Sequence, residues 1–176
     1  MPVSSTLLER FQAASSIFEH MDRLLATSDE RLKRRVEAIS GWTPAQHLCH
    51  LALANTHMLS AVDRIAHQAA PAAAGGGLTM VGRFVLLTGH IPRGKGKAPA
   101  ISIPPSDPGR LEAAEMLGKS RLALLRVKGE LPRIEEATWR VDHYVFGRLD
   151  AQQWLKLVKI HADHHFKIID EILAAG

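Results

Sequence analysis

Apolar residues recur at intervals of three and four along most of this 176-residue chain, the spacing that places them on one face of an α-helix. The first such stretch predicts a long helix over about residues 5–26, with a seam of Leu7, Phe11, Ala14, Phe18, Met21 and Leu25. A shorter helical segment is predicted over about residues 28–39, with Ser28 as its N-cap and Leu32, Val36 and Ile39 on one side. This segment can continue the first helix after a kink.

The stretch "SGWTPAQHL" predicts the start of a second long helix. Thr43 is a suitable N-cap, Pro44 suits the first helical position and Gln46 completes a capping box. The helix should run to about residue 70, and residues 43–62 contain no Asp, Glu, Lys or Arg. Because His, Asn, Gln and Ser interrupt this run too often for a membrane-spanning helix, we expect a helix buried within the protein.

The remaining chain predicts two more long helices and one long connection. Residues 71–106 are rich in Pro, Gly and Lys and read as irregular, with a short helix over about 78–90. Asp107 and Pro108 suit the start of a third helix, which ends near residue 128. After an irregular segment over 129–149, Asp150 caps a last helix over about 151–174. No clear strand is predicted.

These elements together predict an all-α fold. We expect a single four-helix-bundle domain over residues 1–176. Its long 71–106 connection permits a crossover, so the second and third helices need not be antiparallel neighbours.

Composition narrows the classes of function. The net charge of +4 is spread along the chain, without the aromatic-interleaved basic strand of RNA-binding domains, so no nucleic-acid partner is expected. Cys49 is the only cysteine, which excludes an intrachain disulfide and suits a reducing compartment. With no signal peptide recognisable at the N-terminus, the predicted location is the cytoplasm, and no membrane partner is expected.

Two histidines occupy the apolar seam of the last predicted helix. That seam comprises Trp154, Val158, His161, His165, Ile168 and Ile172. Residues four apart lie one turn apart on the same face, so the imidazoles of His161 and His165 can aim their nitrogens at one point. A divalent ion such as zinc accepts nitrogen ligands at about 2.0–2.1 Å, and catalytic sites combine three protein ligands with an open position. The alternative is that both are ordinary hydrogen-bonded core residues.

A third ligand would have to come from the charge-free second helix, which offers His47, His50 and His57. His50 and His57 share a face but lie about 10 Å apart along the axis, too far to bind the same ion. Spacing slightly favours His50 and leaves the choice open. Cys49 points about 100° away from His50 on the helix, so we expect it to be a small core residue.

Two separated stretches, "GWTPAQHLCHLALA" and "GRLDAQQWLKLVKIHADHHFKII", resemble the DinB-like (YfiT-like) superfamily of metal-dependent hydrolases and transferases. The "FGRL" and "QQW" segments are similar to those of an uncharacterised subgroup. The resemblance implies an up-down-down-up four-helix bundle with a long crossover between its second and third helices. It also implies a divalent metal ion, zinc or nickel, bound by His50, His161 and His165. Many members of the superfamily are dimers, which implies a homodimer here.

Three functions are compatible with such a site. The first is metal-dependent hydrolysis of a small molecule at the open coordination position. No general base can be assigned for it, because Asp163 faces away from the seam. The second is transfer of a low-molecular-weight thiol, as in bacillithiol- and mycothiol-dependent S-transferases. The third is a non-catalytic interaction module that the metal stabilises.

Several other residues are candidates for a supporting role. For thiol transfer, the basic loop with Arg93, Lys95 and Lys97 can hold an anionic thiol, although such a run is more often only solvated. His143 and Tyr144 precede the last helix and can reach the mouth of a pocket, although residues in such a loop more often have no role. His164 lies at the edge of the seam, and Trp42 and Trp154 are expected to anchor the core.

Overall fold

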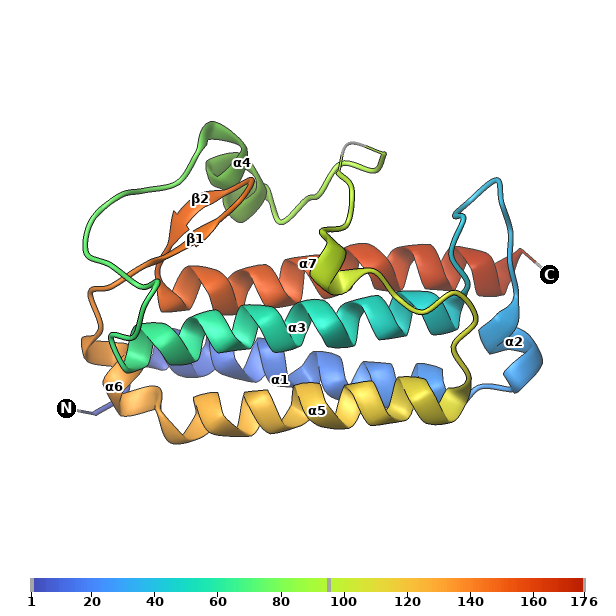
Figure 1. Ribbon diagram of the computed structural model, residues 1–176, viewed down its shortest axis with the longest axis horizontal. Helices are drawn as coiled ribbons and strands as arrows, with labels where there is room; N and C mark the ends of the chain where they lie inside the picture. The colour runs from blue at the N-terminus through green and yellow to red at the C-terminus, as the bar shows by residue number, and fades with distance from the viewer. Residues whose placement is uncertain (1, 95, 176) are drawn as a thin grey trace.

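The computed structural model describes residues 2–94 and 96–175 (Figure 1). Over these residues the chain is mostly helical, which confirms the predicted all-α class. The α-helices are α1 (Ser5–Leu25), α2 (Asp29–Lys33), α3 (Pro44–Ala66), α4 (Met80–Thr88), α5 (Arg110–Gly129), α6 (Leu131–Glu136) and α7 (Ala151–Ala174). A 3-10 turn, η1 (Ala100–Ser102), and two short strands, β1 (Val141–His143) and β2 (Gly147–Leu149), complete the elements.

The four long helices lie side by side (Figure 1). α3 packs against α5 and α7, and α1 packs against the same two helices. α1 and α7 run in one direction and α3 and α5 in the other. Because α3 and α5 are parallel, the segment between them has to travel back along the length of the molecule, and α4 and η1 lie on this connection.

The core lies between the four long helices. α1 buries the seam predicted for it, except that Leu24 rather than Leu25 completes it. α3 is buried over most of its first two turns, including the polar side chains Gln46, His47 and His50. This accords with the charge-free stretch of the sequence, because an unpaired charge there would cost several kcal/mol. No helix among the described residues is long and apolar enough to cross a membrane.

Capping boxes define the first residues of α3 and α7. Thr43 accepts a hydrogen bond from the N–H of Gln46 at 3.2 Å, and Gln46 accepts one from the N–H of Thr43 at 3.0 Å. Asp150 and Gln153 form the same pair at the start of α7. A good N-cap stabilises a helix by roughly 1 kcal/mol. These caps set the register at which the histidines of α3 and α7 face each other.

The prediction of a helix over 28–39 was wrong beyond Lys33. α2 is five residues long, and Val36 instead forms a β-bridge with Ser40. Leu32 is the only buried residue of α2, while Val36 and Ile39 are only half-buried. A longer helix would therefore bury little apolar surface, and nothing offsets the entropy of ordering it.

The predicted start of the third long helix was also wrong. α5 begins at Arg110, and its N-cap residue Gly109 provides no side-chain hydrogen bond. Asp107 instead lies 3.6 Å from Lys33 in an ion pair. The side-chain amide of Gln46 also donates to the carbonyls of Pro105 and Ser106, which holds this segment outside the helix.

A β-hairpin occupies part of the segment predicted to be irregular, so the prediction that the chain has no strand was wrong. β1 and β2 pair antiparallel, with Val141 opposite Leu149. The hairpin also holds the start of α4, because Thr79 donates from its N–H to the carbonyl of Phe146 at 3.0 Å. The short helix predicted over 78–90 is confirmed as α4.

The contact between α4 and the hairpin depends on Gly82, where an added Cβ would lie 2.3 Å from the carbonyl oxygen of Phe146. We expect Gly82→Ala to push α4 away and to lower the free energy of unfolding by about 1–3 kcal/mol, the usual cost of overpacking. Urea denaturation measures this. Gly118→Ala is the control, because Gly118 is exposed in α5 with nothing within 4 Å of its added Cβ. That substitution should stabilise the protein by roughly 0.5–1 kcal/mol. Equal stability of Gly82→Ala and wild type would contradict the close contact.

Candidate metal centre

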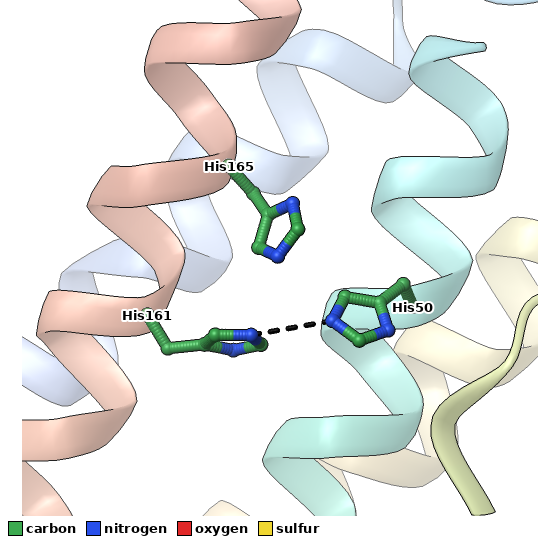
Figure 2. Close-up of side chains that lie close together, drawn as sticks. All are labelled: His50, His161 and His165. Atoms are coloured by element: carbon green, nitrogen blue, oxygen red, sulfur yellow. Dashed lines mark hydrogen bonds between the residues drawn. The ribbon is translucent and has the colours of Figure 1, made fainter. Parts of the chain in front are cut away.

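Three histidines from two helices converge between α3 and α7 (Figure 2). They are His50 on α3 and His161 and His165 on α7, and one ring nitrogen of each lies within 4.8 Å of the others. The Nε2 atoms of His50 and His161 are 3.2 Å apart. Two nitrogens bound tetrahedrally to zinc at about 2.0–2.1 Å stand about 3.3 Å apart. The spacing therefore fits one edge of a tetrahedral coordination shell.

The environment keeps these three imidazoles neutral. Burial lowers the pKa of His50, and the carbonyl of Ser102 offsets part of that shift. Burial lowers the pKa values of His161 and His165 well below the usual 6.5, and neighbouring histidines lower them further. A metal ion binds only the unprotonated nitrogen, so no proton has to be displaced at neutral pH before these rings can bind one.

A backbone carbonyl orients His50. Nδ1 of His50 lies 2.7 Å from the carbonyl oxygen of buried Ser102, in η1. With the proton on Nδ1 donated to that oxygen, the lone pair of Nε2 faces the cluster. Metal-bound histidines usually have such a partner on their second nitrogen.

A fourth histidine orients His165. Nδ1 of His165 lies 2.9 Å from Nδ1 of His47, and Nε2 of His47 lies 3.0 Å from the hydroxyl of Ser40. That hydroxyl oxygen also accepts the N–H of Trp42 at 3.1 Å. If Nδ1 of His165 donates to His47 and Nε2 of His47 donates to Ser40, these three ring nitrogens all have a hydrogen-bond partner. Nε2 of His165 is then left for an ion.

His161 differs from its two partners. Its Nδ1 is buried and has no hydrogen-bond partner among the described residues. Leaving a buried polar atom unpaired costs about 1–3 kcal/mol, and each such atom in a native structure calls for an explanation. Coordination of its other nitrogen supplies one, because the bound ion would favour this ring position over any alternative.

A cavity of about 950 Å³ opens beside the three histidines. Its walls come from α3, α4, the crossover, the β-hairpin and α7, and most of its lining is apolar. Representative wall residues are Met58, Val81, Phe84, Ile101, Phe146 and Leu157. Cavities of this size and character hold small organic molecules. An ion at the three histidines would therefore face a space large enough for a substrate.

The structure places the other candidate ligands outside the group of three. His47 supports His165 from behind, and His57 and His164 line the cavity without joining the group. Burial, followed by the charge of Arg93, lowers the pKa of His164. Asp163 is engaged by Lys159 at 2.6 Å, in agreement with the prediction that it faces away from the seam.

The two tryptophans differ. Trp154 is buried, which confirms its predicted place in the core. Trp42 is only half-buried, and its ring lies 5.0 Å from that of His50 and 5.4 Å from that of His47. Trp42 therefore covers the histidines instead of anchoring the core.

The basic loop is less available to bind an anionic thiol than the sequence indicated. Both terminal nitrogens of Arg93 contact the carboxylate of Glu171 near the end of α7, at 2.7 and 2.8 Å. Lys97 lines the cavity, while Lys95 lies outside the described residues. His143 and Tyr144 also line the cavity, which is the less favoured of the two alternatives that the sequence left open for them.

Sequence reasoning missed the supporting roles of Ser40, His47 and Ser102. His47 precedes His50 by one helical turn, and this spacing was a usable signal that both face the same region. Ser40 and Ser102 lie in irregular segments, where no periodicity indicates which residue will meet a histidine.

Comparison of the chain with protein-family models, with curated proteins and with solved structures found no match. The resemblance to the DinB-like superfamily therefore rests on the two sequence motifs.

We expect the purified protein, supplied with zinc or nickel, to bind about one ion per chain. His50→Ala, His161→Ala and His165→Ala should each lower the occupancy by at least tenfold, because each removes one of three ligands. Elemental analysis after gel filtration measures this. His90→Ala is the matched control, because His90 is exposed and lies outside the group. Occupancy that the three substitutions leave unchanged would exclude this site.

His47 should influence metal affinity without binding the ion. Replacing it with Phe keeps a ring in the buried space but removes the acceptor for His165. We expect metal affinity to fall about 10–100-fold, as is usual when the hydrogen-bond partner of a ligand is lost. Competition with a chromophoric chelator measures this affinity. His57→Phe, on the same helix, should leave the affinity unchanged, and equal losses in the two variants would contradict the role of His47.

Cys49 should be inert in the folded protein. Its thiol is fully buried, and burial, together with Glu112, raises its pKa to about 12. The reactive thiolate is therefore scarce at pH 8. We expect no reaction with a chromogenic disulfide reagent in the native state and complete reaction in urea. Cys49→Ser should leave metal occupancy unchanged. Rapid labelling of the native protein would show that the thiol is accessible after all.

Proposed function

We propose that this protein is a divalent-metal-dependent hydrolase of an apolar small molecule. In this proposal His50, His161 and His165 hold zinc or nickel. The observation that carries it is the position of three neutral imidazoles beside a cavity of about 950 Å³. When bound, such an ion supplies Lewis acidity, which polarises a carbonyl and lowers the pKa of water or of a thiol.

The protein's own residues would supply orientation and exclusion of water. Ser102 and His47 contact two of the proposed ligand rings through hydrogen bonds, which restrict how those rings can turn. The apolar walls would reduce the number of water molecules around the reacting groups, which strengthens electrostatic interactions there. The substrate should therefore be mostly apolar, because most of the lining offers no partner to a polar or charged group.

A second candidate function is transfer of a low-molecular-weight thiol to an electrophile. It is favoured by the absence of a free carboxylate in the cavity among the described residues. Asp142 lines the cavity, but Arg148 contacts it at 2.9 Å. Hydrolysis gains from a general base, whereas thiol transfer requires only an activated thiol and room for two molecules. Against this candidate, the ion pair of Arg93 with Glu171 leaves fewer free cations for an anionic thiol.

The fold assignment is part of the same proposal. We propose a DinB-like four-helix bundle in up-down-down-up order, formed by α1, α3, α5 and α7. The directions of these helices and the parallel pair α3 and α5 support it. A homodimer is likewise proposed from the resemblance alone.

We expect the zinc- or nickel-loaded protein to hydrolyse nitrophenyl esters, and to prefer longer acyl chains because the cavity is apolar. Release of nitrophenol measures the rate, and His50→Ala should lower it at least a hundredfold. His90→Ala is the control with unchanged rate. A parallel assay pairs low-molecular-weight thiols with a chlorinated dinitrobenzene. Metal-dependent turnover only in the second assay would replace hydrolysis with thiol transfer. No turnover in either assay, with metal-dependent thermal stabilisation, would indicate the non-catalytic module.

A further inference from the structure

His143 is a polar residue in the cavity wall that is not part of the metal centre. It ends β1, and it lines the cavity together with His50, His161 and His165. Most of the surrounding wall is apolar. A polar group in such a wall is the natural means of orienting a ligand, because the apolar contacts have no direction.

Its hydrogen bonds determine which nitrogen carries the proton. Nδ1 of His143 accepts the backbone N–H of Val145 at 3.1 Å and that of Phe146 at 3.3 Å. Because both partners are donors, Nδ1 has to present a lone pair. The proton of the neutral ring is therefore on Nε2. Nε2 itself has no hydrogen-bond partner among the described residues.

Two aromatic rings stack against His143 in this orientation. Tyr144 stacks against it with 4.6 Å between ring centroids, and Phe146 stacks at 4.4 Å. Burial, and secondarily His57, lowers the pKa of His143 to about 4, so the ring is neutral at pH 7. A neutral ring with its proton on Nε2 is a hydrogen-bond donor, not a base and not a cation.

We propose that the Nε2–H of His143 donates a hydrogen bond to an uncharged oxygen of the substrate, such as a ketone, ester or amide carbonyl. This deepens the proposed function, and it rests on that function in taking the cavity to be the substrate site. The lining of the cavity indicates the class of ligand. An apolar molecule fits the mostly apolar walls, and one uncharged oxygen on it can accept the hydrogen bond from the neutral ring of His143. An anion at this position would face no compensating charge from His143.

A pair of fluorescent probes that differ only in the acceptor tests this. They are 2-acetonaphthalene, which has a carbonyl, and 2-ethylnaphthalene, which has none. We expect the metal-free wild-type protein to bind the ketone about fivefold more tightly than the hydrocarbon, the usual effect of one hydrogen bond. His143→Phe, which keeps the stacked ring but removes the donor, should abolish this preference without changing the affinity for the hydrocarbon. His143→Gln, which restores an N–H donor, should recover most of it.

Three results would overturn the proposal. The first is equal affinity of the wild type for the two probes. The second is an unchanged preference for the ketone in His143→Phe. The third is failure of either probe to bind the wild type. Thermal melting of both variants checks that each is folded, and recovery by His143→Gln separates loss of the donor from damage to the hairpin.

Metal occupancy and ester turnover are measured on the same preparations. Normal turnover without a ketone preference would overturn only the role of His143. An intact preference without turnover would overturn only the proposed hydrolase.

Discussion

The close approach of His50 and His161 is the constraint on which the rest of the site depends. Their Nε2 atoms lie 3.2 Å apart across the contact between α3 and α7. Two imidazolium rings could not share this space, because each charge would be buried beside another of the same sign. The contact therefore excludes protonation of both rings, and burial favours the neutral form of each by lowering its pKa. Neutral rings with free lone pairs are in turn what a divalent cation binds.

The crossover between α3 and α5 contributes more to the site than its irregular sequence indicates. Ser102 in η1 provides the carbonyl that orients His50. α4 forms part of the cavity wall and is held at its start by the β-hairpin. Arg93 ties the same connection to α7 through Glu171. A long connection that only joined two parallel helices would need none of these contacts, so its course is better explained by the cavity that it covers.

Features that depend on residues close in the sequence were predicted better than features that depend on contacts between distant segments. Helical periodicity and capping residues are local, and they predicted α1, α3 and α7 closely, together with the capping box of α3 and the Asp150 cap of α7. The pairing of His161 with His165 is also local, one turn along a helix. The proximity of His50 to that pair depends on the packing of α3 against α7. The spacing of residues in the sequence therefore left His47 and His57 open as alternatives. The resemblance selected His50, which the structure brings beside the pair.

The failures have two causes. α2 stops early because a longer helix would bury little apolar surface, whereas the late start of α5 and the position of the β1–β2 hairpin involve contacts with distant segments. Asp107, for example, has the sequence features of an N-cap but forms an ion pair with Lys33. β1 and β2 are three residues each, too short for alternation to stand out. The pattern of neighbouring residues was therefore not enough to predict the structure of these segments.

The hydrophobic core determines how much a bound ion could contribute to the stability of this fold. The described residues bury a continuous hydrophobic cluster drawn from all four long helices. Structural zinc domains are usually small and lack such a core, so that binding the ion supplies the free energy of folding. Here the ligands are already neutral, and two of the three are fixed by Ser102 and His47. Binding would then add an ion to helices that the core already holds together. Under the proposed function, the three histidines beside a large apolar cavity serve chemistry on a bound molecule and not the assembly of the helices.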